Sequence, residues 1–375
     1  MRYKTRLIIN LNLFAKNFER VKKLAPKNEI LYIVKANAYG HGLVPMVRFA
    51  VQELGIKEIG CASLGEALEV RESLPELDVI PYVLSDLGLS SLSSARAYVE
   101  KKILPVVHNF ADLDFILSQS DFRYIPLCLK FNTGMNRLGF SLDDMDLLVA
   151  KLKQHQRKII HHMVSHLACG SSSIKLENNL LQLSRFKQIK KRLQDEGFSV
   201  ERSSLANSGA VEQGFALDET HVRPGIMLYG VSSLNKETRQ GVWQGEPIST
   251  LETYVLRSFE IKKGTPVSYG ATPCPEDGIL AIIAIGYGDG FSTRYNGVSL
   301  KVGEHIGKVV GRVNMDMANV LFPREAKSEL TSGRILKIWD HSQTEILNLA
   351  EQVATVPYEL FCQLSIRLPR IYTFK

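Results

Sequence analysis

Lys35 is the residue of this chain whose type and setting most directly suggest chemistry. It follows an apolar run at 30–34, and a loop that carries Gly40 and Gly42 comes at once after it. A lysine at the end of a buried strand is costly unless its charge is used or suppressed. Desolvation favours the neutral amine, which is a nucleophile toward carbonyl groups. The position therefore predicts Schiff-base chemistry, and the alternative is a strand-end lysine whose amine reaches water without a chemical role.

Short apolar runs recur through the first two-thirds of the chain. They lie at 30–34, 56–61, 79–84, 103–107, 126–131, 159–164, 200–205 and 222–229. Segments with helical periodicity separate most of them, and several begin with a cap pair such as Ser63 with Glu66 or Ser141 with Asp144. Eight strands that alternate with helices predict an α/β fold with a (β/α)8 TIM-type barrel. A doubly wound open sheet is the alternative, because counting strands cannot close a barrel.

The barrel hypothesis predicts where functional residues should lie, since barrel enzymes carry them at the carboxyl ends of the strands. Polar or glycine-containing positions end or follow several of the predicted strands: Lys35, Lys130, Arg137, His166, Asn207, Ser208, Arg223, Gly225 and Ile226. We therefore expect these residues to gather at one rim of the barrel.

The pattern changes near residue 241. Short β-rich runs at 253–261, 279–285, 298–302, 307–313 and 334–339 are separated by Gly, Pro, Asp and Asn, and helical periodicity is scarce until 344–353. We predict a barrel domain over 10–240 and a mostly-β C-terminal domain over 241–375.

Composition and charge narrow the class of protein. A length of 375 residues favours two domains, and 45% hydrophobic with 23% charged residues is typical of soluble globular proteins. No apolar run approaches the roughly 18 residues of a spanning helix. Five scattered cysteines without CxxC spacing predict reduced thiols in a cytoplasmic protein and no metal site.

The net charge of +7 comes from basic residues that are spread along the chain, so it does not indicate a nucleic-acid partner. The densest basic cluster, around Lys190, lies on a predicted helix and is followed by Asp195 and Glu196, which is typical of a solvated helix face. A small anionic cofactor accounts for part of the positive balance.

In its motifs the chain resembles the alanine racemases. Residues 34–42 are similar to that family's pyridoxal-phosphate lysine motif, and further similarity follows in order at 132–139, 206–208, 222–230, 267–270, 285–290, 311–316 and 356–359. The resemblance spans essentially the whole chain. It implies a fold-type III barrel, a β-domain that the N-terminal strand 1–9 joins, and a homodimer whose active sites are shared between subunits.

The resemblance also implies two opposed bases. Lys35 would bind pyridoxal 5'-phosphate through a Schiff base and, once an amino acid displaces it, would act as a base at Cα. Tyr269, reaching over from the partner subunit, would be the second base on the opposite face. A tyrosine near its reference pKa of about 10 is a poor base at neutral pH. His166 and Arg223 would stabilise its phenolate as a cationic hydrogen-bond chain.

Cofactor contacts are implied in the same way. The phosphate would be bound by Tyr39, Ser208, Gly225, Ile226 and Tyr358, with Asn207 also in the cofactor site. Arg223 would face the pyridine nitrogen, and arginine can only donate hydrogen bonds. The nitrogen would then stay unprotonated, which favours simple proton exchange over transamination.

The remaining implied roles concern the substrate. Its carboxylate would meet Arg137 and the backbone of Met315, and Tyr287 would line the entrance. Lys130 matches a lysine that is carbamylated in many relatives, and Asp316 would support the partner-side loop.

The implied activity is an isomerase that interconverts L-alanine and D-alanine and supplies D-alanine for peptidoglycan. Gly288, Asn314 and the pair at 170–171 depart from the family pattern, so a broader-specificity or serine racemase stays open. A pyridoxal-phosphate decarboxylase is disfavoured by Arg223 and Tyr269, since those relatives have a glutamate at the pyridine nitrogen. A pyridoxal-phosphate carrier protein is disfavoured because it is usually a lone barrel.

Overall fold

Eight parallel strands form a closed barrel in the computed structural model, which describes residues 5–89, 91–235, 238 and 243–374. Closure rests on the pairing of the first barrel strand with the last, where Glu29 lies opposite His221 and Ile30 opposite Val222. The predicted (β/α)8 barrel is confirmed, and the open sheet is excluded. In chain order the strands are β2 (Glu29–Ile33), β3 (Glu58–Ser63), β4 (Ile80–Asp86), β5 (Leu104–Val107), β6 (Cys128–Lys130), β7 (Ile159–Val164), β8 (Ser199–Asn207) and β9 (His221–Arg223).

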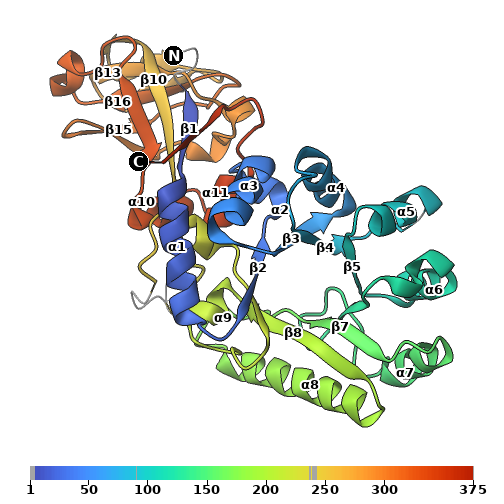
Figure 1. The fold of residues 1–375 in the computed structure, drawn as a ribbon. Helices are drawn as coiled ribbons and strands as arrows, with labels where there is room; N and C mark the ends of the chain where they lie inside the picture. The colour runs from blue at the N-terminus through green and yellow to red at the C-terminus, as the bar shows by residue number, and fades with distance from the viewer. Residues whose placement is uncertain (1–4, 90, 236–237, 239–242, 375) are drawn as a thin grey trace.

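Helices follow the strands around the outside of the barrel (Figure 1). Ser63 caps α4 as the sequence predicts, because its side chain accepts a hydrogen bond from the backbone N–H three residues on. Asn109 caps α6 in the same way. The chain-order bounds are α1 (Leu11–Leu24), α2 (Lys35–Tyr39), α3 (Leu43–Leu54), α4 (Leu64–Ser73), α5 (Leu92–Glu100), α6 (Phe110–Ser118), α7 (Met145–Gln154), α8 (Leu176–Asp195) and α9 (Ser208–Glu212).

Two boundaries differ from the sequence prediction. The eighth strand was expected over 222–229 but ends at Arg223, because Pro224 cannot donate to a strand ladder and the chain then winds into the 3-10 helix η2 (Ile226–Tyr229). The helix expected to start at Ser141 begins at Met145 instead. Ser141 N donates to the Asp144 carboxylate at 2.7 Å, and this bond closes a turn before the helix.

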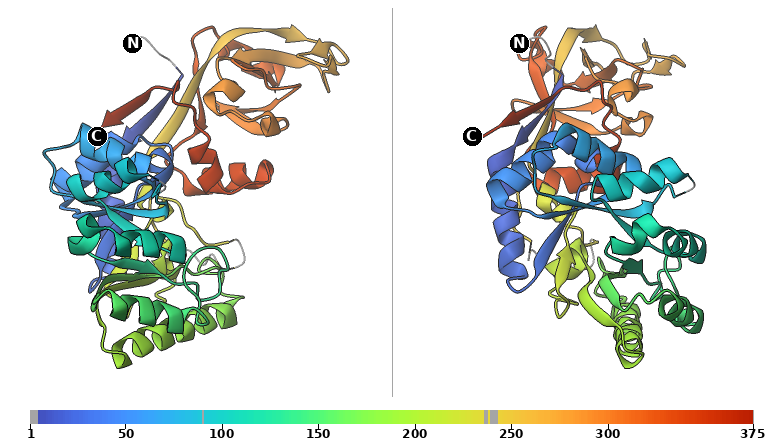
Figure 2. Two further views of the ribbon diagram at one scale, coloured as in Figure 1. Left: turned by 90° about the vertical axis from the view of Figure 1, so that its right-hand side faces the viewer. Right: turned by 45° about the vertical axis from the view of Figure 1, so that its right-hand side comes forward.

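A second sheet has the strand order β13-β16-β15-β14-β17-β10-β1-β18, and β10 also pairs with β13. Figure 2 shows it standing beyond one end of the barrel. In β1, Leu7 and Ile9 are fully buried while their neighbours face the other side, as the two-residue period of a strand requires. The bounds are β1 (Arg6–Asn10), β10 (Ser249–Ile261), β13 (Gly278–Ile283), β14 (Ser299–Val302), β15 (His305–Val309), β16 (Ala318–Phe322), β17 (Ile335–Trp339) and β18 (Arg370–Thr373).

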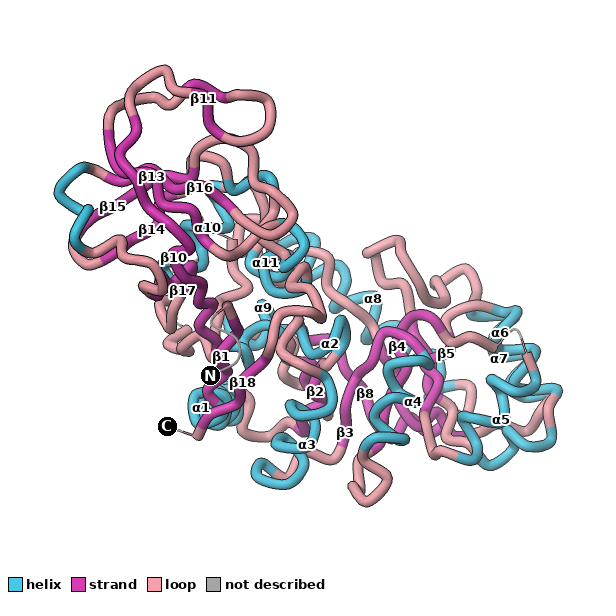
Figure 3. The backbone as a smooth tube through the Cα atoms, turned by 90° about the horizontal axis from the view of Figure 1, so that it is seen from above, coloured by secondary structure: helices cyan, strands magenta, loops and turns pink. Residues whose placement is uncertain are grey.

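Both ends of the chain enter this second sheet. Strand β1 runs antiparallel to β10 and parallel to β18, so the three strands lie side by side (Figure 3). The expected domain boundary between residues 240 and 241, and residues 1–4 of the expected N-terminal strand, lie outside the described residues.

Shorter elements complete the C-terminal part. Helix α10 covers the segment predicted at 344–353, whereas β16 and α11 had no counterpart among the predicted elements. No helix within the described ranges is both long and apolar enough to cross a membrane. The bounds are β11 (Pro266–Val267), β12 (Thr272–Pro273), α10 (Gln343–Gln352), α11 (Pro357–Cys362), η1 (Ser120–Tyr124), η3 (Tyr287–Asp289), η4 (Thr293–Tyr295) and η5 (Arg324–Ser328).

Candidate active site

A cavity opens at the carboxyl ends of the barrel strands, and most of the residues singled out in the sequence line it. Ile226 does not; its side chain is fully buried just beyond Gly225, at the start of η2. The lining residues that the sequence predicted are Lys35, Tyr39, Lys130, Arg137, His166, Asn207, Ser208, Arg223, Gly225 and Tyr358.

Lys35 is presented to this cavity by an unusual backbone. The four residues after it, at 36–39, have φ between 52° and 55°, so α2 is a left-handed turn. A non-glycine residue in this conformation costs roughly 1–2 kcal/mol. Short hydrogen bonds oppose that cost: Ala38 N donates to Val34 O at 2.7 Å, and Asn37 Oδ1 accepts from Leu43 N at 2.7 Å.

The charge state of Lys35 is set by its surroundings. It remains open to solvent in the single chain, yet protein atoms surround its amine on most sides. Burial lowers the pKa of Lys35, and the positive charge of Arg137 lowers it further, while Glu66 acts in the opposite direction. A lysine with a lowered pKa supplies more free amine near neutral pH, which is the form that attacks a carbonyl group.

Gly225 and Tyr39 approach each other so closely that only glycine fits. A Cβ built at Gly225 would lie 2.3 Å from the Tyr39 hydroxyl oxygen. Gly225 N also donates to Ser208 Oγ at 2.8 Å. Two hydroxyl groups therefore converge on one side of the cavity, beside a backbone N–H that bonds Ser208, and Tyr358 lines it as well. Such a donor set suits a phosphate group.

Arg223, the last residue of β9, is a buried cation, and its hydrogen-bond acceptors among the described residues are all neutral. Its Nη1 donates to Ser204 Oγ at 2.6 Å, and its Nη2 donates to the carbonyl oxygen of Ser165 and lies 3.3 Å from His166 Nδ1. Burial lowers the pKa of Arg223 to about 10, so it still carries its charge at neutral pH. That charge is free to act on a ligand in the cavity.

His166 differs from the expectation of a cationic hydrogen-bond chain. Burial, followed by the charge of Arg223, holds its pKa well below the usual value. The imidazole is therefore neutral, and the positive charge of the pair resides on Arg223. Asn207 Nδ2 lies 3.4 Å from His166 Nε2, which completes the contacts of the ring.

Lys130 ends β6 and lies deep in the cavity. Its Nζ donates to Leu84 O at 3.1 Å. Burial and then the charges of Arg223, Arg137 and Lys35 lower the pKa of Lys130 to about 8. Close to neutral pH this lysine has a reactive neutral fraction.

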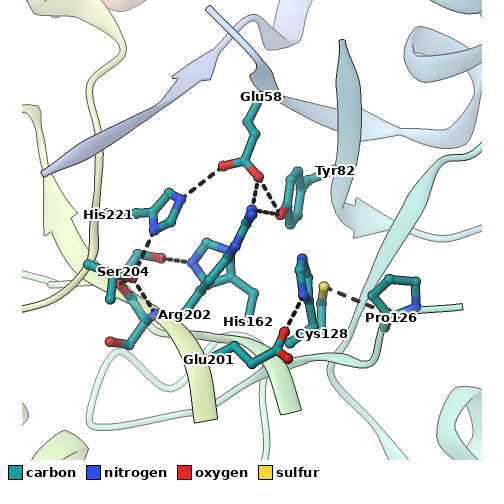
Figure 4. Close-up of polar contacts among 12 residues, drawn as sticks. Glu58, Tyr82, Pro126, Cys128, His162, Glu201, Arg202, Ser204 and His221 are labelled. Carbon is teal, nitrogen blue, oxygen red and sulfur yellow. Dashed lines mark hydrogen bonds and ion pairs between the residues drawn. The ribbon is translucent and has the colours of Figure 1, made fainter. Parts of the chain in front are cut away.

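A second polar cluster joins residues of several barrel strands (Figure 4), and Ser204 links it to Arg223. Glu58 and His221, the first residues of β3 and β9, pair at 3.0 Å, and Arg202 and Tyr82 also bond the Glu58 carboxylate. Although burial acts to raise the pKa of Glu58, His221 and Arg202 hold it below the usual value. The negative charge of Glu58 is therefore balanced by these partners near the amino ends of the strands, away from the cavity.

The other predicted residues, Tyr269, Tyr287, Met315 and Asp316, do not line the cavity. Tyr269 is 71% exposed and Met315 53% exposed, on the β-rich part of the chain. Their loops are joined to one another. Tyr287 N donates to Asn314 O at 2.9 Å, and Ser268 Oγ, next to Tyr269, lies 2.9 Å from Asn314 Oδ1. The predicted residues thus form two groups on one chain.

Sequence reasoning missed Arg367, which holds this second group together. Its Nε donates to Asp289 at 2.8 Å, and its Nη2 pairs with Asp316 at 2.9 Å and lies 3.3 Å from Met315 O. A Cβ at Gly288 would lie 2.8 Å from the same Nη2, so the glycine leaves room for the arginine. Arg367 belongs to none of the motifs, and no signal in the sequence distinguishes it from other surface arginines.

The part of the chain that the structure describes contains no candidate metal-binding site. Among those residues, no group of three His, Cys, Asp or Glu side chains is placed to hold an ion.

Comparison with known proteins identifies the same two parts of the chain. The family model "Alanine racemase, N-terminal domain" matches residues 9–233, and "Alanine racemase, C-terminal domain" matches residues 248–372. Among curated relatives, the alanine racemase of Vibrio cholerae is 32% identical over 369 residues, which is 97% of each chain.

Solved structures are similar over the same extent. The alanine racemase from Acinetobacter baumannii superposes with a TM-score of 0.84 at 28% identity and covers 99% of each chain. The alanine racemase from Bartonella henselae, described with covalently bound pyridoxal phosphate, has the same fold, with a TM-score of 0.82 at 24% identity over 99% of this chain and 100% of that one.

Proposed function

Because the chain belongs to the alanine racemase family, we propose that it interconverts L-alanine and D-alanine and so supplies D-alanine for peptidoglycan. One observation carries the proposal: a lysine of lowered pKa lines the same cavity as a buried arginine that has no carboxylate partner among the described residues. The lysine suits covalent attachment to an aldehyde, and the arginine suits a ring nitrogen that must not be protonated.

We assign pyridoxal 5'-phosphate as the cofactor. The donor set fits its phosphate, with Tyr39, Ser208 and Tyr358 hydroxyls and the Gly225 N–H at the cavity wall. Arg223 fits its ring nitrogen and Lys35 its aldehyde. When bound, the cofactor supplies the electron sink that makes the Cα–H bond of an amino acid acidic.

Two groups on opposite faces of the substrate then move the proton. The amine of Lys35 removes the Cα proton on one face and holds it at Nζ. Tyr269 of the partner subunit delivers a proton from its hydroxyl on the other face, and the reverse direction exchanges the two roles. A single base would return the proton to the face from which it came, so inversion requires both groups.

Arg223 restricts the outcome to proton exchange. Its guanidinium has no acceptor to offer and keeps its charge, so a proton on the facing nitrogen would meet a cation. His166 and Ser204 fix the direction of the guanidinium. His166 contacts Arg223 but is neutral, so the pair carries the single positive charge of Arg223.

Arg137 is the group we assign to the substrate carboxylate, together with the backbone of Met315, and Tyr287 lines the entrance. We further propose that Lys130 becomes a carbamate: the neutral amine adds CO2, its nitrogen forms a bond to carbon, and one proton leaves. The resulting anion can pair with Arg137. A pKa near 8 supports this step because it supplies the neutral amine.

We propose a homodimer, which would bring together the two separate groups of site residues. Each chain would offer its cavity to the Tyr269, Tyr287, Met315 and Asp316 group of the partner. We propose the domain division at 10–240 and 241–375 with strand 1–9 in the second domain, and a cytoplasmic location for the enzyme.

The test incubates the purified protein and pyridoxal phosphate with each L-amino acid in heavy water and resolves the enantiomers. Alanine is expected to appear as both enantiomers with deuterium at Cα. Deuterium at Cα without inversion would contradict the two-base mechanism. If serine is racemised faster than alanine, serine is the preferred substrate and the proposed substrate is wrong.

A second test addresses the shared site. Mixing inactive Lys35→Ala and Tyr269→Phe chains should restore activity, since one site in each hybrid dimer has both bases intact. No recovery despite proven subunit exchange would contradict the shared site.

A further inference from the structure

We propose that Glu66 is a positioning residue for Lys35, and that its carboxylate clamps the left-handed turn from which the lysine projects. The inference rests on the proposed role of Lys35 in binding the cofactor. Glu66 lies in the first turn of α4, outside every motif by which the chain resembles its family.

The carboxylate bridges two neighbouring loops at the rim of the barrel. Glu66 Oε1 accepts from Ala36 N at 2.6 Å, and Oε2 accepts from Ala62 N at 2.7 Å. Ala36 is the residue directly after Lys35 and the first with a left-handed φ, whereas Ala62 lies near the end of β3. One side chain therefore fastens the strained turn to the adjacent barrel strand.

The position of the clamp matters because the other bonds of the turn lie further along it. Ala38, Gly40 and Gly42 donate to carbonyl groups within the turn or just before it. Ala36 N points instead to Glu66, so the start of the turn depends on a residue thirty positions away. Without that acceptor, the Ala36 N–H would lose its bond and the backbone could leave the left-handed region.

Glu66 also supplies a negative charge in a cationic surrounding. It raises the pKa of Lys35 against the effect of burial and of the nearby arginines. Within the described ranges of the chain, no Asp or Glu is among the residues that line the cavity. The titratable and charged groups around Lys35 are the cations of Lys130, Arg137 and Arg223, the neutral His166, the hydroxyls of Tyr39 and Tyr358, and the thiol of Cys362.

Two separable effects follow. Loss of the clamp should slow the condensation in which the Lys35 amine and the cofactor aldehyde form a C=N bond and release water. Loss of the charge should lower the pKa of Lys35 and shift the pH profile of that condensation to lower pH. A residue that only stabilised the fold would not move the pH profile.

The experiment uses full-length chains stripped of cofactor and then mixed with pyridoxal phosphate. Visible absorbance follows attachment from pH 6 to 10, and borohydride reduction with peptide mass analysis gives the fraction attached at Lys35. The variants are Glu66→Ala and Glu66→Gln, which keeps one acceptor oxygen but no charge. Glu69→Gln is the matched control, since Glu69 lies three residues on in α4 and is exposed.

Glu66→Ala is expected to lower the plateau rate of attachment at least tenfold, and both Glu66 variants should show the midpoint of the profile at lower pH. Glu66→Gln should lose less of the plateau rate, and Glu69→Gln should match the parent chain. If Glu66→Ala does not fold, the plateau rate of attachment and the midpoint of the pH profile measured for Glu66→Gln test the inference instead. An unchanged plateau or an unchanged midpoint overturns the inference. A parent chain that never attaches pyridoxal phosphate contradicts the proposed function instead.

Discussion

Replacing Gly225 by alanine tests whether the close approach between this residue and Tyr39 forms the phosphate side of the cavity. The added Cβ would lie 2.3 Å from the Tyr39 hydroxyl oxygen and 2.9 Å from its Cζ. Ordinary carbon contacts begin near 3.4 Å, so either the ring or the backbone must move by about 1 Å. The Tyr39 ring has little freedom, because its centroid lies 4.9 Å from that of Tyr229 and 6.0 Å from that of Tyr358.

The magnitude follows from the cost of overpacking a rigid site. An inserted methyl group of this kind costs about 1–3 kcal/mol. Cofactor binding is weakened by the part of this strain that the free chain relieves by moving Tyr39 and that binding must restore. Since 1.4 kcal/mol is a tenfold change in an equilibrium constant, full relief in the free chain would weaken binding about 5- to 150-fold. Any part of the strain that the free chain does not relieve should lower the free energy of unfolding instead.

The assay titrates each stripped variant with pyridoxal phosphate and follows the visible absorbance, with denaturant unfolding in parallel. Gly65→Ala is the matched control, since a Cβ there meets only Ser63 Oγ at 3.7 Å and the backbone is not left-handed. Tyr39→Phe removes the closest clashing atom, so it should cost less affinity in the Gly225→Ala background than in the parent chain. Wild-type affinity in Gly225→Ala, or equal costs of Tyr39→Phe in both backgrounds, would refute the reasoning.

Three further outcomes are expected. Arg223→Glu should raise side transamination, measured as pyruvate and the amino form of the cofactor, because a carboxylate lets the ring nitrogen hold a proton; no rise would contradict the role of Arg223. ¹³CO2 labelling of Lys130, followed by NMR, should increase as pH rises through about 8, since only the neutral amine adds CO2; a pH-independent or absent signal would count against the carbamate. Arg367→Met should raise KM for alanine more than it lowers kcat, because the Met315 loop loses its contact to the arginine; a matched Arg334→Met variant should leave KM unchanged, and equal behaviour of the two would exclude the role of Arg367.

The sequence predicted the fold well where periodicity and caps agree. The eight barrel strands alternate with helices, and capping side chains such as Ser63 mark the residue at which a helix begins. Prediction was less successful where a short element depends on tertiary contacts. Helix α11 has only six residues. Gly40 lies so close that a Cβ there would be 2.0 Å from Phe361 O in this helix, a contact that local sequence does not reveal.

The cavity residues were predictable because parallel strands bring their carboxyl ends to one rim. Glu66 and Arg367 were not, since each acts through bonds to residues distant in the chain. Glu66 is recognised in the sequence only as the partner of the Ser63 cap, and its bond to Ala36 depends on how α4 sits against the turn. The left-handed φ values at 36–39 were also not predictable, because alanine and tyrosine rarely adopt this conformation and a single asparagine does not indicate four such residues in a row.

The charge of the cavity links the separate assignments. Lys35, Lys130, Arg137 and Arg223 line it, with no Asp or Glu among the described lining residues. Burial and then the repulsion between these like charges lower the pKa values of the two lysines. Such a cavity favours an anion on each side: a phosphate at Gly225, a carboxylate at Arg137 and a carbamate at Lys130 in place of a cation. Each anion would raise the pKa of the remaining amine. The pH at which Lys35 becomes reactive should therefore rise as the cavity fills.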